Sequence, residues 1–539
     1  MTPASKIRIT TSVVLLILGL MSLLAIVMGQ GFTDAAQATQ DGLQPLLRWY
    51  YPLCVAFFLG FMGYIGLGPH AGLRLGDDHE QPEFNRLSWL SMLFAAGTGV
   101  GLLFWSVAQP MEMLGQHPFG NHLSPADERM LALRLTFFHW GLNGWAIFAV
   151  TGVCMAYAAF RRHRSLAISA TLAPLIGRRS QGWVGYGVDA LAVLATIIGI
   201  TTTLGLGVEQ INAGLGELAD LPQATGYQLL VILVVTLVAT VSVLSGLRRG
   251  VRILSEVNIL LSIILLLAFL FIGETGRLMA ILVQATGAYL QHLPGLSFYT
   301  GADDAAGWQQ QWTVFYWAWW IAWSPFVGLF IARISRGRTL GEYAFGVLVV
   351  PSVFSFLWIS WLGGTALQLE DQGAGIAAAM EEDVARALFV TIAALPTWPI
   401  MITILSWLAL ILIGFYYITS ADSGTLVITS LLQGDENRVS RGYRGAWALG
   451  MGALTAVLLY AGGIEALQAT VTLAALPFSV LILLMVGCLI TWLRLEPTAP
   501  TRPVPRPHQV PHEPWAGEEQ RDEEQQKQPA RPRRKRSTG

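Results

Sequence analysis

The sequence predicts an all-α polytopic membrane protein with twelve transmembrane helices. Hydrophobic residues make up 54% of the 539 residues, whereas charged residues make up only 12%. Because soluble domains carry about 25% charged residues, this chain lacks the polar surface that water requires. Apolar runs of about 20 residues, each long enough to cross the hydrocarbon layer, recur from Ile9 to Trp492.

The apolar runs define the expected spans. The first run, Ile9 to Met28, has no small-residue cleavage site and is longer than the core of a signal peptide, so we expect it to remain as a membrane helix. The longest runs exceed what a straight span needs and are expected to be tilted or broken. The twelve spans are expected near residues 9–28, 50–69, 88–112, 135–160, 184–216, 226–246, 254–273, 311–333, 342–362, 399–431, 445–462 and 466–493.

Basic residues are distributed unevenly between the two sides of these spans. With a cytoplasmic N-terminus, eighteen Lys and Arg residues fall in inside segments, five fall in outside segments, and ten lie from Arg494 onward. This bias predicts an even number of spans with both termini in the cytoplasm, in a bacterial inner membrane. Cys54, Cys154 and Cys488 all lie in apolar runs, and their spacing fits neither a disulfide framework nor a metal site.

The spans fall into two groups of five, preceded by two leading spans. The connection between the groups is only moderately apolar, which favours an interfacial helix and an outer loop. The C-terminal tail is rich in Pro, Glu, Gln and Arg and is predicted to be disordered. Its basic end, Arg531 to Arg536, either contacts the anionic inner leaflet or is simply solvated. The expected parts are residues 1–86 (N-terminus and leading spans), 87–275 (first repeat), 276–310 (interfacial helix and loop), 311–494 (second repeat) and 495–539 (tail).

Irregular segments recur at matching positions in the two groups. GTGVG at residues 97–101 is expected to break the first span of one group, and WSPFVG at 323–328 the first span of the other. The third spans carry TTTLGLG at 201–207 and TSADSG at 419–424. Small residues at helix contacts explain a single cluster of this kind equally well. Paired interruptions, however, indicate an inverted-repeat transporter with its binding site at mid-membrane.

Tryptophan is concentrated in two segments. WTVFYWAWWIAW at residues 312–323 has five tryptophans over more than three helical turns, so they cannot all lie at the membrane interface. HWGLNGWAIF places Trp140, Trp145 and Phe148 on one side of the fourth span. Two such helices that face each other would form a cage, which binds quaternary ammonium groups by about 2 kcal/mol or more per desolvated ring contact.

Other classes of protein fit the sequence less well. It has no HExxH motif, no paired catalytic carboxylates and no Ser/His constellation, so we expect neither catalysis nor a cofactor. A channel needs neither paired broken helices nor an aromatic cage. A sensor without transport activity would bind the solute but not move it.

Four motifs resemble the betaine/carnitine/choline transporter family, over about Ile9 to Leu495. The resemblance implies two leading helices, a five-plus-five inverted repeat and a homotrimer surrounded by membrane lipid, with no nucleic-acid partner. It also implies symport of sodium with a quaternary-ammonium solute such as glycine betaine. A choline or carnitine carrier that uses protons or substrate exchange is the alternative. The motifs are Met92 to Met111, Phe137 to Val150, Trp312 to Thr339 and Thr419 to Gly434.

By position, the resemblance implies a substrate cage and an approach to it. Trp317 and Trp323 would line the approach. Phe148 stands where betaine-type members usually have tyrosine, so the ring is present without its hydroxyl. The cage itself would consist of Trp140, Trp145, Phe148 and Trp320.

The resemblance also implies sites for the coupling ion. A second site would involve Thr196 and Phe326, but its remaining position is Ile200, which has no coordinating atom. Asp422, a carboxylate within the membrane, is interpreted as a structural hydrogen-bonding group in preference to a proton relay. The first sodium site would consist of Ala95, Thr98, Tyr416, Thr419 and Ser420.

Overall fold

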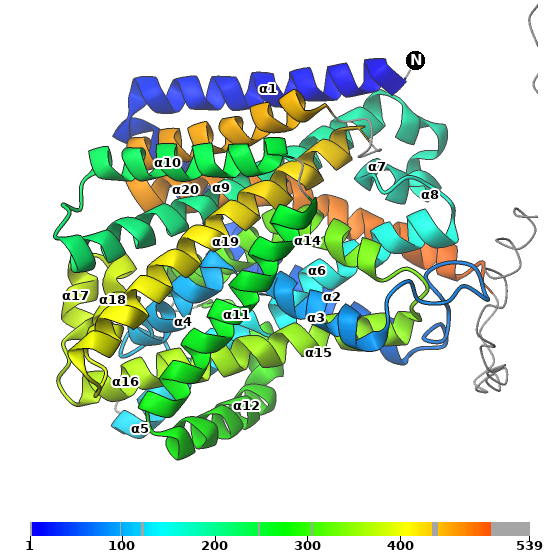
Figure 1. Cartoon of the computed structure of the whole chain (residues 1–539). Coiled ribbons are helices and arrows are strands. Elements are labelled where there is room, and N and C mark those ends of the chain that lie inside the picture. Colours follow the sequence, from blue (N-terminus) through cyan, green and yellow to red (C-terminus); the bar gives the residue numbers. More distant parts are fainter. Residues whose placement is uncertain are drawn as a thin grey trace, which may run out of the picture. The chain divides into compact units, whose positions relative to one another are not determined.

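The computed structural model is a bundle of helices (Figure 1). It describes residues 3–97, 99–119, 123–245, 248–302, 306–433 and 440–496. Within these ranges every regular element is helical, apart from one isolated bridge between Arg74 and Thr339. Thr98 of the expected sodium site and the predicted disordered tail from residue 497 lie outside the described residues.

The helices follow one another with short connections. Single π-helical turns follow α6 at Tyr157–Arg161, precede α14 at Gln310–Val314 and follow α15 at Ile359–Gly363. The helices are α1 (Pro3–Met28), α2 (Gln30–Leu67), α3 (Arg86–Gly97), α4 (Val100–Glu112), α5 (Pro125–Trp140), α6 (Leu142–Ala156), α7 (Ile168–Thr171), α8 (Ala173–Ile176), α9 (Trp183–Ala219), α10 (Thr225–Ser245), α11 (Arg248–Ile272), α12 (Thr275–Ser297), α13 (Ala306–Gln309), α14 (Phe315–Ile334), α15 (Leu340–Trp358), α16 (Gly364–Asp371), α17 (Ile376–Glu382), α18 (Ala387–Ala393), α19 (Pro399–Gln433) and α20 (Arg441–Leu493).

The helix lengths confirm an all-α polytopic membrane protein. In the described part of the chain, ten helices are long and apolar enough to cross a membrane. The expected span near 88–112 corresponds to α3 and α4, which are absent from these ten because each helix has fewer than 18 residues. Helix α20 covers the last two expected spans and is counted once although it bends. The number twelve therefore stays a prediction.

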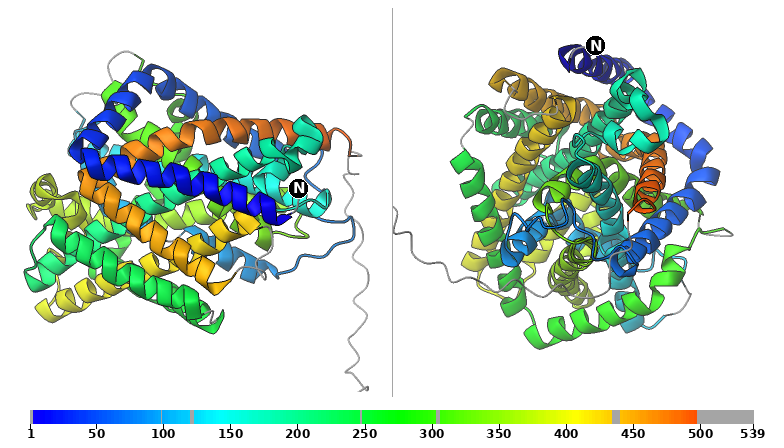
Figure 2. Two further views of the ribbon diagram at one scale, coloured as in Figure 1. Left: turned by 90° about the horizontal axis from the view of Figure 1, so that it is seen from above. Right: turned by 90° about the vertical axis from the view of Figure 1, so that its right-hand side faces the viewer.

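Helix α20 bends at Gly462 and Gly463, where the backbone leaves the helical conformation (Figure 2). Gly463 has φ 61° and ψ −142°, a region that favours glycine. A Cβ atom on Gly462 would lie 2.2 Å from Thr33 Oγ1 on α2, and this hydroxyl donates to the Ala461 carbonyl oxygen at 3.1 Å. The two glycines thus let α2 approach the bend. The Thr33 hydroxyl of α2 can then donate to the Ala461 carbonyl oxygen, which the bend frees.

Helix α14 is continuous, so the expected break at residues 323–328 is wrong. Pro325 lies inside the helix and has no N–H to donate to the Ile321 carbonyl oxygen. The Ser324 hydroxyl donates to that oxygen instead, at 2.8 Å. Because the missing bond is replaced, the helix passes through the proline without a break. The expected break at residues 97–101 is present, since α3 ends at Gly97 and α4 begins at Val100.

The most deeply buried helices lie at the centre of the bundle. Helix α14 packs against α6, α9 and α20, and most of its residues are buried. Helix α1 lies along one edge and exposes a long apolar face, as a lipid-facing helix would (Figure 1). Helix α12 occupies the stretch for which an interfacial helix was predicted and lies at the periphery of the bundle (Figure 2). The three cysteines are free and buried.

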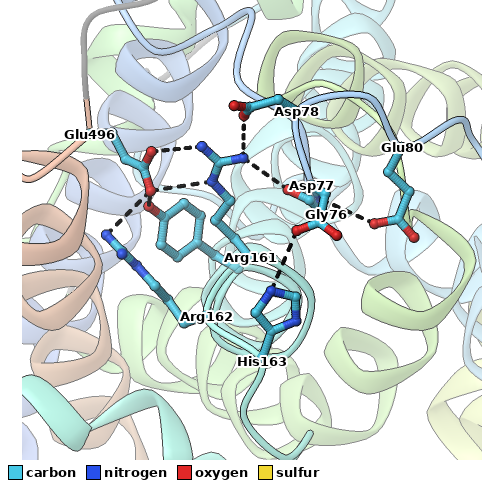
Figure 3. Close-up of polar contacts among 9 residues, drawn as sticks. Gly76, Asp77, Asp78, Glu80, Arg161, Arg162, His163 and Glu496 are labelled. Atoms are coloured by element: carbon cyan, nitrogen blue, oxygen red, sulfur yellow. Dashed lines mark hydrogen bonds and ion pairs between the residues drawn. The ribbon is translucent and has the colours of Figure 1, made fainter.

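Polar contacts join four segments at one end of the bundle, and Figure 3 shows the contacts around Arg161. Arg161, at the end of the π-helical turn after α6, donates to Gly76 and Asp78 in the α2–α3 loop and to Glu496 beyond α20. The α2–α3 loop is in turn paired with the α14–α15 loop, where Leu75 N donates to the Arg338 carbonyl oxygen at 2.8 Å. These segments carry many of the arginines that the charge pattern assigns to the cytoplasmic side.

Candidate functional site

Aromatic side chains from α5, α6 and α14 surround a small internal cavity. Its volume is about 20 Å³. Apart from Trp323, which is partly buried, these aromatic side chains are at most 6% exposed. Five of the six residues assigned to the predicted cage and its approach line this cavity. The lining residues are His139, Trp140, Gly144, Trp145, Phe148, Trp320, Trp323 and Ser355.

The rings of this group, which we call the cage, mostly pack edge to face. The ring centroids of Trp140 and Trp320 are 4.8 Å apart with the planes at 77°. The Trp145 and Phe148 rings are 5.3 Å apart at 75°, and the Phe148 and Trp320 rings 5.7 Å apart at 72°. Such contacts stabilise a pair by about 0.5–1.5 kcal/mol beyond burial. The cage is therefore a preorganised apolar wall.

A break between α5 and α6 positions one side of the cage. Gly141 separates the two helices with φ −96° and ψ −144°, which leaves the His139 carbonyl oxygen free to accept from Trp320 Nε1 at 2.9 Å. Gly144 lies directly beneath that indole, since a Cβ atom there would be 3.1 Å from Trp320 Nε1. The sequence HWGLNGW therefore brings the tryptophans of α5 and α14 into contact by combining a helix break with a residue that has no side chain.

Gly101, in the first turn of α4, leaves room for the rings of Trp140 and Trp319. A Cβ atom on Gly101 would lie 2.6 Å from Trp319 Cη2 and 3.5 Å from Trp140 Cη2. The Trp319 ring in turn stacks on Trp320, with centroids 4.7 Å apart and planes at 14°. Trp319 does not line the cavity but packs against Trp320, which does.

Trp317, predicted to line the approach, lies elsewhere. Its side chain is fully buried, 5.1 Å from the Phe138 ring and 5.6 Å from the His139 ring. It lines neither the cage nor the larger cavity described next. Since α14 is a regular helix, Trp317 and Trp323 cannot both face the same space.

A second cavity of about 400 Å³ adjoins the cage, and Trp323 lines both. It lies between α11, α14 and α19, with Met92 of α3 at its border. Its lining combines apolar side chains with hydroxyls, one amide and the guanidinium of Arg333. The lining residues are Met92, Ser255, Asn258, Ile259, Trp323, Phe326, Val327, Leu329, Phe330, Arg333, Tyr416, Thr419, Ser420, Ser423, Leu426 and Val427.

Three of the five residues of the predicted first sodium site line this larger cavity: Tyr416, Thr419 and Ser420. The Thr419 hydroxyl lies 2.9 Å from the Phe415 carbonyl oxygen, to which it donates, and accepts from Asn258 Nδ2 at 3.1 Å. Ala95 lies in the last turn of α3.

The residues of the predicted second sodium site are not brought into one cavity. Phe326 lines the larger cavity, whereas Thr196 is fully buried and donates to the Ala192 carbonyl oxygen at 2.8 Å. Asp422 accepts from Ser242 Oγ at 3.4 Å, and the structural role of this carboxylate stays a prediction. Among the residues that the structure describes, no three His, Cys, Asp or Glu side chains form a metal site.

Sequence reasoning did not single out several residues at these cavities. Ser355 of α15 lines the cage, and its buried hydroxyl has no hydrogen-bond partner among the described residues. Asn258 of α11 lines the larger cavity and contacts Thr419. Gln109 of α4 accepts from Trp140 Nε1 at 3.0 Å. Single polar residues in apolar helices carry no pattern that separates these positions from structural ones.

Comparison with known proteins identifies the family of this chain. Residues 9–498 match the profile described as betaine/carnitine/choline family transporter. The glycine betaine transporter OpuD of Bacillus subtilis is 42% identical over 459 residues, which cover 85% of this chain and 88% of the relative. A glycine betaine transporter of Acinetobacter baylyi is 38% identical, with 90% and 73% covered, and the high-affinity choline transport protein of Escherichia coli is 39% identical, with 85% and 68% covered. The chain belongs to the betaine/carnitine/choline family of transporters.

Proposed function

We propose that this protein imports a quaternary-ammonium solute, with glycine betaine as the leading candidate, by symport with sodium and alternating access. The observation that carries the proposal is the cage. Trp140, Trp145, Phe148, Trp320 and Trp323 surround one cavity and offer it almost only aromatic surface. A trimethylammonium group donates no hydrogen bond, and ring quadrupoles bind it by about 2 kcal/mol or more per desolvated contact.

The burial of the cage supports a conformational change during transport. Apart from the partly buried Trp323, its rings are at most 6% exposed. Side chains that line the cavity must therefore move before the solute can enter. The larger cavity begins at Trp323 and leads toward Arg333, near the arginine-rich end of the bundle. We assign it as the route by which the solute leaves toward the cytoplasm.

The proposed coupling ion is sodium, bound between the broken helix and α19. Hydroxyl and carbonyl oxygens are hard ligands without full charge, and they suit a monovalent cation near helix ends. Thr419 and Ser420 supply the hydroxyls, and Ala95 and Tyr416 the carbonyl oxygens. Sodium binding here would join α3 to α19 and stabilise the arrangement of the broken helix, so that the solute binds after the ion.

The location and assembly belong to the same proposal. We infer a bacterial inner membrane with both termini in the cytoplasm, because the basic residues gather in the segments that this orientation places inside. A homotrimer surrounded by lipid is the proposed assembly. Chemical cross-linking in the native membrane would test it.

The test of function is uptake of radiolabelled glycine betaine into proteoliposomes. We expect accumulation with an inward sodium gradient and none when potassium replaces sodium. Empty liposomes and liposomes containing the Trp320→Ala variant serve as controls. If no quaternary-ammonium compound either enters the proteoliposomes or binds to the protein, the proposal is refuted.

A choline carrier is the second candidate. Several relatives are named as choline transporters, and Phe148 offers no hydroxyl to a substrate carboxylate. Choline carries the same trimethylammonium group but no carboxylate. Uptake of choline, driven by protons or by exchange in the absence of sodium, would favour this candidate over betaine symport.

A further inference from the structure

A row of buried, hydrogen-bonded side chains ends on Trp140 of the cage. Trp140 Nε1 donates to Gln109 Oε1 at 3.0 Å. Gln109 Nε2 lies 2.6 Å from His139 Nδ1, and His139 Nε2 lies 3.1 Å from Thr313 Oγ1. Gln109 and His139 have no exposed area, and Thr313 is 1% exposed. Solvent therefore cannot replace any of these partners, and each unmade bond would leave a buried polar group unsatisfied.

The direction of these hydrogen bonds determines the protonation of His139. An indole N–H only donates, so the Gln109 atom that faces Trp140 must be the amide oxygen. The Gln109 amide nitrogen then faces His139 Nδ1 and donates to it. His139 Nδ1 is therefore unprotonated, and the proton of the neutral imidazole is on Nε2, from which it is donated to Thr313 Oγ1.

We propose that His139 is a positioning residue for the substrate cage. Its side chain holds Trp140 through Gln109, and its backbone carbonyl oxygen holds Trp320. The backbone contact is the hydrogen bond from Trp320 Nε1 to the His139 carbonyl oxygen, 2.9 Å long. One residue thus orients both rings of the closest pair in the cage. The role in substrate binding rests on the proposed function, whereas the orientation of the two rings does not.

The imidazole is itself held in one orientation. It stacks on the Tyr316 ring with centroids 4.6 Å apart and planes at 8°, and the Trp317 ring meets it edge to face at 5.6 Å and 75°. This contact gives Trp317 a function although it lines neither cavity. Because these contacts prevent the His139 imidazole from rotating, the Gln109 amide that it accepts from keeps its orientation.

The reversed amide would release the cage. If Gln109 turned its nitrogen toward Trp140, two donors would face each other and the indole would lose its acceptor. A proton on His139 Nδ1 would enforce that reversal, because Nδ1–H would then meet the Gln109 NH₂ group. If Nε2 kept its proton as well, the imidazolium would also place a cation next to a ring that binds the cation of the solute. The neutral form with the proton on Nε2 is thus the one that serves the cage.

The first experiment reads the tautomer without any solute. Protein with ¹⁵N-labelled histidine is reconstituted in lipid, and the His139 resonances are identified by their loss in His139→Asn. The chemical shifts of the two ring nitrogens distinguish a protonated from an unprotonated nitrogen. We expect an unprotonated Nδ1 and a protonated Nε2 at neutral pH. A protonated Nδ1 would overturn the proposal whatever the protein transports.

The second experiment compares two replacements of the same residue. His139→Asn places an amide oxygen near the position of Nδ1, where it can accept from Gln109, whereas His139→Leu has similar bulk and no acceptor. For glycine betaine or choline, measured by quenching of tryptophan fluorescence, we expect His139→Leu to raise the dissociation constant about tenfold and His139→Asn to stay within about threefold of wild type. In uptake, the leucine variant should raise KM more than it lowers the maximal rate.

Further variants separate positioning from folding. Gln109→Met has the same length without the acceptor and should weaken binding as His139→Leu does. The control is His292→Leu on the peripheral helix α12, an exposed histidine whose ring lies 2.9 Å from the Ala288 carbonyl oxygen, and this change should leave binding unaltered. Equal losses in His139→Asn and His139→Leu, or no loss in His139→Leu, would overturn the proposal. If wild type binds no quaternary-ammonium compound, the proposed function fails, and the tautomer measurement still decides the orientation of Gln109.

Discussion

The Glu496 carboxylate and the Arg161 guanidinium form a two-point contact at the end of the bundle. Arg161 Nη2 lies 2.8 Å from Glu496 Oε2, and Arg161 Nε lies 3.2 Å from Glu496 Oε1 (Figure 3). The Glu496 side chain is only 7% exposed and also accepts from the Tyr157 hydroxyl at 2.8 Å. The contact connects the end of α20 to the end of α6. Bidentate, charge-assisted pairs of this kind are among the stronger hydrogen bonds in proteins.

Replacement of Glu496 should destabilise the protein in a way that depends on pH. The hydrogen bonds from Arg161 hold the pKa of the Glu496 carboxyl below its ordinary value. The interaction therefore contributes stability above the unfolded-state pKa, about 4.3, and this stability is lost as the pH falls through the lower folded-state pKa. We expect Glu496→Gln to cost about 1.5–3 kcal/mol near pH 7.

Thermal unfolding in detergent, followed from pH 7 down to about pH 3 so that the range passes below the unfolded-state pKa, is the measurement for this variant. The difference between wild type and Glu496→Gln should shrink toward the acid end of the range. Glu465→Gln provides a matched control, because the Glu465 side chain accepts an exposed hydrogen bond from Gln37. A difference that stays constant with pH would contradict the predicted role of the carboxylate charge.

Removal of the Trp320 ring should abolish uptake without preventing membrane insertion. Trp320 contacts Trp140 and Phe148 and lines the cage. Loss of a cation–π contact of about 2 kcal/mol corresponds to roughly thirtyfold weaker binding of the solute. Trp320→Phe keeps a ring but loses the bond to His139, so its loss should be smaller. Trp398→Ala, at a position that is 75% exposed, is the control, and unchanged affinity in Trp320→Ala would exclude the cage as the binding site.

Addition of a hydroxyl to Phe148 should change the preference between two solutes. Phe148→Tyr places a hydrogen-bond donor at the cage, where glycine betaine has a carboxylate and choline does not. We expect the ratio of the two dissociation constants to move about fivefold in favour of glycine betaine. Competition binding with both solutes measures this ratio directly. A uniform change for the two solutes would mean that the hydroxyl does not reach the carboxylate.

Loss of the hydroxyls of α19 should weaken sodium coupling more than solute binding. In Thr419→Val and Ser420→Ala, we expect the sodium concentration for half-maximal uptake to rise about tenfold, as loss of one buried polar ligand would cause. At saturating sodium the affinity for the solute should be nearly that of wild type. Ser423→Ala is the matched control, because Ser423 lines the same cavity and is outside the predicted ligand set. An equal effect in all three variants would argue against the site.

Much of the fold was predictable because it depends on composition and on simple periodicity. Apolar runs of membrane length require helices, since a backbone in lipid must satisfy its own hydrogen bonds. The same reasoning identified the break at residues 97–101, where three glycines surround Thr98 and Val100. It failed at residues 323–328, because the Ser324 hydroxyl replaces the bond that Pro325 cannot make.

The sequence by itself determined the class of protein and the two segments in which tryptophans gather, because composition and helical spacing are local properties. Only the tertiary structure decided which tryptophans face that cavity, and it turned Trp323 toward the space and Trp317 toward His139. It also decided the partners of His139, since Gln109 and Thr313 come from α4 and from the turn before α14. Hydrogen bonds between distant segments depend on how helices pack, and no short-range pattern records that packing.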